Sequence, residues 1–89
     1  MAALRVAVET ELGVKEYPVT PRVEVDFERH WGVGIGKAFA EMRKEHVHHL
    51  AWLAVKASGE SVKPFDGWLD TIIGTDVLVE EARPFTGTP

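Results

Sequence analysis

Three of the four histidines of the chain lie close together, at His46, His48 and His49. Glu45 and His48 have the Glu-x-x-His spacing that carboxylate-bridged metal sites use on helices. Such a site needs further carboxylates from neighbouring helices, and this sequence offers only scattered acids on short predicted helices. Because His48 and His49 point about 100° apart on a helix, they cannot chelate one ion together. We therefore expect these histidines to lie on a wet or partly buried helix face, with no metal or other cofactor.

Two further patterns have the spacing of known functional motifs but lack the neighbouring residues that those motifs require. The glycines Gly32, Gly34 and Gly36 are spaced like those of a phosphate-binding loop, but they follow a predicted helix and lack the adjoining Lys-Ser/Thr pair. They predict a hinge. Asp66 and Asp70 are one helical turn apart and are more typical of a solvated acidic face than of a general acid–base pair. No nucleophile stands in an elbow motif, so the sequence predicts a protein that is not an enzyme.

Composition limits the alternatives. The chain has 89 residues, 45% of them hydrophobic and 27% charged, which is typical of one small globular domain. It contains no cysteine and carries a formal net charge of −4. Residues 37–58 carry four basic and two acidic side chains, a balance too weak to favour nucleic-acid binding. Neither a signal peptide nor an apolar run of about 20 residues is present, so we expect a soluble, intracellular protein without membrane contact.

The N-terminal half predicts a β-hairpin followed by a helix. Residues 4–9 alternate and are rich in valine, and residues 14–19 form a plausible second strand, with Thr10 to Gly13 as the loop. Gly13 suits a positive φ, and Pro18 belongs near the end of an edge strand. Thr20 and Pro21 are a good helix start, and Gly32 ends that helix.

The second half predicts a long central helix from about Lys37 to Ala57, a short helix over residues 64–73, and a weakly alternating segment, 76–80, that is compatible with a last strand. We expect an α+β fold in which the hairpin packs on three helices. One domain should span residues 1–82, with a mobile tail at 83–89. The predicted core consists of Val6, Val8, Phe27, Phe39, Leu50, Leu53, Trp68 and Leu69.

The end of the central helix is apolar on all sides, because six consecutive residues from Leu50 to Val55 are apolar. A surface helix normally has a polar face, so this turn must be enclosed by its own fold or by another chain. The chain is small, and self-association into a homo-oligomer is therefore expected. Trp52 lies opposite the main apolar stripe and is either part of a core shared with Trp31 and Trp68 or an anchor for a partner.

An ordered set of segments resembles a known family. The segments are Phe27–Gly34 (FERHWGVG), His49–Ala54 (HLAWLA) and Pro64–Asp70 (PFDGWLD), after a hairpin and a Thr20-Pro21-Arg22 helix start. Over residues 4–82 the chain resembles the small tail assembly chaperones of long-tailed, siphovirus-type bacteriophages, particularly those of actinobacterial hosts.

The resemblance implies a non-catalytic protein that acts in the cytoplasm of the infected bacterium. Members of the family bind the tape measure protein, keep it soluble, promote assembly of tail tube subunits and are absent from the mature virion. Many of their genes also give a longer product by ribosomal frameshifting, so this chain would be the short product. We expect the tape measure segment to lie on an apolar surface centred on Trp52 and Val55 and flanked by Met42 and Val47.

Two other functions compete with this one. A structural virion protein of the tail or of the head–tail connector would remain in finished particles. A small metal- or DNA-binding regulator is motivated only by His46, His48, His49 and the basic balance of the central helix.

Overall fold

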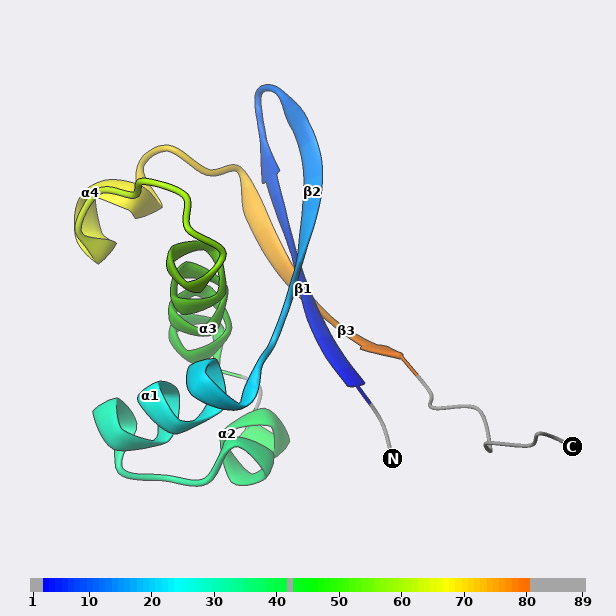
Figure 1. Cartoon of the computed structure of the whole chain (residues 1–89), viewed down its shortest axis with the longest axis vertical. Helices are drawn as coiled ribbons and strands as arrows, with labels where there is room; N and C mark the ends of the chain where they lie inside the picture. Colours follow the sequence, from blue (N-terminus) through cyan, green and yellow to red (C-terminus); the bar gives the residue numbers. More distant parts are fainter. Residues whose placement is uncertain (1–2, 42, 81–89) are drawn as a thin grey trace, which may run out of the picture.

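The computed structural model of the protein describes residues 3–41 and 43–80. These residues form an α+β fold in which helices pack on one face of a three-stranded antiparallel sheet, as predicted (Figure 1). The elements, in chain order, are β1 (Ala3–Thr10), β2 (Gly13–Pro18), α1 (Pro21–Trp31), α2 (Ile35–Glu41), α3 (Lys44–Ala57), α4 (Phe65–Leu69) and β3 (Gly74–Glu80).

The sheet has the order β2-β1-β3, so the first strand of the chain is the central one. The hairpin is confirmed: Val6 pairs with Tyr17, and Gly13 closes the turn with a φ of 121°. Pro18 is the last residue of the edge strand β2. At this position the ladder needs no N–H donor, so the missing N–H of proline costs no hydrogen bond. The last strand is confirmed as well, and it places Val77 opposite Val6.

Helix α1 has the ends that its sequence predicts. The Thr20 hydroxyl accepts a hydrogen bond from the Val23 N–H at 3.4 Å, and Pro21 occupies the first turn. Gly32 adopts a left-handed conformation, φ 72°, and its N–H donates to the Glu28 carbonyl at 2.8 Å. The predicted glycine hinge is shorter than expected, because Ile35 already begins α2 and its N–H donates to the Glu28 carboxylate at 2.9 Å.

The prediction of one central helix over residues 37–57 is wrong. Two helices occupy this stretch, and Arg43 between them is extended, with φ −76° and ψ 132°. An extended residue breaks the run of i to i−4 hydrogen bonds, and the separate α2 can then turn Ala38 into the core, where it is 1% exposed. The helix α3 is still the longest, with 14 residues.

The core lies between α3 and the inner face of the sheet. Of the predicted core residues, Val6, Val8, Phe27, Leu50 and Trp68 are buried, whereas Leu53 and Leu69 are only half-buried. The side chain of Phe39 lies outside the described part of the structure. The core is completed by Tyr17, Val23, Ala38, Ala51, Ala54 and Val55.

Four of the six residues in the apolar turn of α3 are enclosed by the fold of the chain itself. Leu50, Ala51, Ala54 and Val55 are each at most 4% exposed, because α3 packs on all three strands and on α1 and α4. The enclosure of these four residues therefore needs no second chain, whereas Trp52 and Leu53 are half-buried. Among the described residues, no helix has the length and the apolar character that crossing a bilayer requires.

Candidate functional site

Three of the four histidines, His30, His46 and His49, form one cluster with most of the aromatic side chains between α1, α3 and α4. His49 lies at its centre: the Trp31 indole N–H donates to His49 Nδ1 at 3.1 Å, and the His30 ring stacks on His49 with centroids 4.2 Å apart. The Phe65 ring meets His49 edge-on at 5.0 Å. His46 lies 4.6 Å from Trp31, also edge-on.

The cluster keeps His49 neutral. Burial, together with smaller contributions from the neighbouring His30 and His46, lowers the pKa of the His49 imidazole to about 4. Because Nδ1 accepts the Trp31 N–H, the proton of the neutral ring lies on Nε2. Protonation of Nδ1 would cost this hydrogen bond and would leave a charge in a site that is only 5% exposed to water. The arrangement is that of a packed structural cluster.

The Glu-x-x-His spacing brings no metal ligands together. Glu45 is exposed and pairs with Arg43 at 3.8 Å, while His48 Nδ1 lies 2.7 Å from the Thr75 hydroxyl on β3. Burial lowers the pKa of His48, with a further contribution from Lys44. In the part of the chain that the structure describes, no three His, Asp or Glu side chains are grouped as metal ligands. His46 Nδ1 is buried without a hydrogen-bond partner among these residues.

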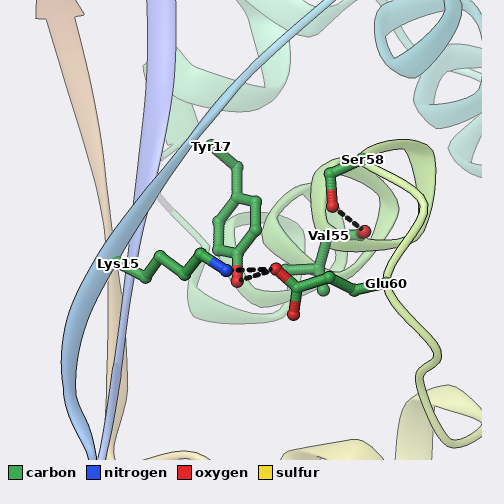
Figure 2. A network of polar contacts seen from close by, with 5 residues as sticks. All are labelled: Lys15, Tyr17, Val55, Ser58 and Glu60. Carbon is green, nitrogen blue, oxygen red and sulfur yellow. Dashed lines mark hydrogen bonds and ion pairs between the residues drawn. The ribbon is translucent and has the colours of Figure 1, made fainter.

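A polar network ties the hairpin to the connection between α3 and α4. The Glu60 carboxylate accepts from the Lys15 ammonium at 2.6 Å and from the Tyr17 hydroxyl at 2.9 Å (Figure 2). These hydrogen bonds lower the pKa of Glu60, and the bond to Glu60 raises the pKa of Lys15. Burial raises the pKa of the Tyr17 phenol, and the bond to Glu60 adds to this. The network fixes the loop after α3 against β2.

The structure separates the residues predicted to bind a partner. Val55 is 4% exposed and lies in the core, so in the folded chain it presents no binding surface. Val47 and Trp52 are half-buried. Because they are five residues apart in the sequence, their side chains point about 140° apart around the axis of α3. Met42 lies outside the described residues. The three described members, Val47, Trp52 and Val55, therefore do not form one exposed surface.

Trp52 has a structural environment of its own. Its indole N–H donates to the Lys63 carbonyl at 2.9 Å, its ring meets Phe65 at 5.9 Å, and the Lys56 ammonium lies over it at 5.1 Å. The side chain thereby fastens the start of α4 to α3. Trp52 is half-buried, and its indole N–H and ring already contact Lys63, Phe65 and Lys56 within the fold.

The large apolar side chains that are free on the surface lie mainly at the end of the hairpin. Leu12 is 100% exposed, Val14 66% and Ile73 63%; Val25, on α1, is 41% exposed. Leu12 and Ile73 line a surface groove of about 500 Å³ together with Thr10, Glu11, Asp70, Thr71 and Ile72. Sequence reasoning missed this site. The signal was a leucine at a tight turn, where Gly, Asn or Asp is usual.

Comparisons of this chain with protein-family models, with curated proteins and with solved structures find no match.

Proposed function

We propose that this protein is a non-catalytic tail assembly chaperone of a long-tailed bacteriophage, which binds the tape measure protein and keeps it soluble in the cytoplasm of the infected bacterium. In this role it also promotes tail tube assembly and leaves before the virion is complete. The order of segments over residues 4–82 suggests the family, and one structural observation carries the binding role. Leu12 and Ile73, both large and apolar, stand mainly in solvent at one end of a small charged domain.

This observation supports binding because exposed apolar side chains are ordinarily isolated on a monomer's surface, whereas clustered ones mark contacts with other molecules. The net charge of −4 would help a loaded chaperone to remain in solution. His49, at the centre of the histidine cluster, already accepts the Trp31 N–H and stacks on His30, so this residue supports no catalytic role.

Co-expression tests the proposal. Wild type should keep the tape measure protein of the same phage in the soluble fraction. Leu12→Ser combined with Ile73→Ser should lose this effect while the circular dichroism spectrum stays unchanged, since both side chains are exposed. Val25→Ser, an exposed apolar residue of α1, is the matched control and should behave as wild type. A wild-type protein that leaves its client insoluble would contradict the proposal.

Trp52→Ala tests the surface that the sequence predicts. We expect this variant to be less stable, because it releases the Lys63 carbonyl and the Phe65 ring, and to keep the client soluble at temperatures where it is folded. If the folded variant no longer binds the client, Trp52 is part of the client-binding site.

Mass spectrometry of purified virions separates the chaperone from the second candidate, a structural protein of the tail or of the head–tail connector. The chaperone should be missing from finished particles. A fixed stoichiometric amount in the virion would favour the structural protein.

A further inference from the structure

The groove at the hairpin end is formed by two segments far apart in the sequence. One wall is the hairpin turn, Thr10 to Leu12, and the other is the connection from α4 to β3, Asp70 to Ile73. Figure 1 shows both at the same end of the molecule, beyond the ends of the longer helices.

Hydrogen bonds hold both walls in place before any partner arrives. The Ile73 N–H donates to the Glu9 carbonyl at 2.7 Å, which joins the connection to β1. The Thr71 hydroxyl donates to the Trp68 carbonyl at 2.7 Å, and the Leu12 N–H donates to the Thr10 hydroxyl at 3.2 Å. A partner would therefore lose little of its binding energy in ordering the groove.

The groove combines apolar surface with uncompensated negative charge. Leu12, Ile72 and Ile73 supply the apolar surface, and the exposed carboxylates Glu11 and Asp70 stand beside it. Among the described residues that line the groove, no side chain is basic, and none of the ion pairs formed by the described residues includes these two carboxylates.

We propose that this groove binds an amphipathic helical segment of the client in which lysine or arginine side chains flank a stripe of large apolar ones. The apolar stripe would cover Leu12 and Ile73, and the basic side chains would meet Glu11 and Asp70. An acidic rim repels an acidic segment and attracts a basic one, so the rim selects among amphipathic helices that are equally apolar. The identity of the client in this inference rests on the proposed function. The chemistry of the bound segment, apolar with basic flanks, is inferred from the groove alone.

Synthetic peptides test the chemistry directly. The probe is a fluorescein-labelled peptide of about 15 residues, long enough to form a helix, with leucine and lysine at amphipathic spacing. Its twin carries glutamate in place of lysine. Fluorescence anisotropy should show binding of the lysine peptide that weakens as salt rises, and no binding of the glutamate peptide. Equal binding of the two peptides would overturn the proposal.

Two pairs of variants locate the site. Leu12→Ser with Ile73→Ser should weaken binding of the lysine peptide about tenfold or more, whereas Val25→Ser should not change it. Glu11→Gln with Asp70→Asn should weaken binding and flatten its salt dependence. The control, Glu41→Gln with Asp66→Asn, changes the net charge equally outside the groove and should have a smaller effect. An equal effect of the two charge pairs would mean attraction by net charge alone and would overturn the proposal.

Light scattering in the same experiments examines a second copy of the chain as the occupant. If the Leu12 and Ile73 substitutions dissolve a self-associated form and leave peptide binding unchanged, the groove belongs to a subunit contact and the proposal fails. The proposed function is tested separately by client solubility. If the client stays soluble but the protein shows no preference between the peptides, the groove proposal is rejected and the proposed function is kept. If the lysine peptide binds but the client is not kept soluble, the proposed function is rejected and the groove proposal is kept.

Discussion

His49 shows how a single buried side chain makes the stability of this protein depend on pH. The ring is 5% exposed and accepts a hydrogen bond from Trp31, and its folded pKa of about 4 lies below the ordinary value near 6.5. In the unfolded chain the ring is in water and protonates near the ordinary value. Between these two pKa values the unfolded state binds more protons than the folded state, so acid favours unfolding.

We therefore expect the free energy of unfolding to be unaffected by His49 above about pH 6.5 and to fall as the pH drops toward 4. The loss can reach about 3 kcal/mol, from the difference between the two pKa values. Denaturant titrations at a series of pH values measure it. His49→Gln keeps an oxygen acceptor for the Trp31 indole but cannot titrate in this range, and its stability should vary less with pH. A parallel pH dependence in both proteins would contradict this account.

Tyr17 gives a second test at the residue scale, because it is the only tyrosine of the chain and its ionisation can be followed without ambiguity. Burial, and then the hydrogen bond to Glu60, raise the pKa of its phenol above the usual value of about 10. Glu60→Gln removes the acceptor charge, so the phenol should ionise at a lower pH than in wild type. Ultraviolet absorbance during an alkaline titration measures this, with circular dichroism to show that both proteins are folded.

If the phenol of the Glu60→Gln variant ionises at the same pH as that of wild type, burial alone sets the pKa. The network that joins β2 to the loop after α3 would then contribute nothing to the electrostatics of Tyr17.

At the scale of elements, α3 decides whether the fold holds, and its faces can be distinguished by truncation. Leu50 is fully buried, whereas Leu53 is only half-buried, although the sequence predicts both for the core. Leu50→Ala should cost about 2–5 kcal/mol of folding free energy, and Leu53→Ala should cost clearly less. Thermal or denaturant unfolding of the two variants measures the difference. A larger loss at Leu53 would mean that α3 is rotated relative to the sheet.

The elements also show what local sequence can and cannot predict. Strand alternation, the Thr20-Pro21 helix start and the Gly32 stop are local signals, and the hairpin and α1 follow from them. The break at Arg43 has no such signal, because neither glycine nor proline stands there and the gain from burying Ala38 arises only in the folded chain. The same holds for Val55: its burial depends on α3 lying across the sheet.

The candidate groove was beyond sequence reasoning for a related reason. Leu12 and Ile73 are 61 positions apart in the chain and line the same groove only because β3 pairs beside β1. Hydrophobic periodicity in the sequence predicts which face of one helix or strand is buried. It does not predict which elements lie at the same end of the molecule.

At the scale of the whole molecule, self-association stays a prediction, but the surface expected to form the contact is now the outer face of the sheet. Most of the apolar turn of α3 is already enclosed, but the helices of the described residues lie on one face of the sheet only, and Ala7 lies at the centre of the other. We expect light scattering over a concentration series to give a mass above the 9.9 kDa of one chain, because a second copy can cover this outer face. Ala7→Arg should lower the mass, and Val25→Arg, on α1, should not. A single-chain mass at every concentration would contradict this prediction.

The sheet order also has a consequence for how the chain acquires its fold during synthesis. The ribosome makes β1 first and β3 last, yet β1 is the central strand: Val6 pairs with Tyr17 nearby and with Val77 almost at the other end of the described residues. One edge of β1 therefore stays unpaired until nearly the whole domain has been translated. Contacts of such long sequence separation slow folding relative to an all-helical protein of this length. A nascent chain arrested before Gly74 would present that edge to other strands, which makes translation the period of greatest exposure to mispairing.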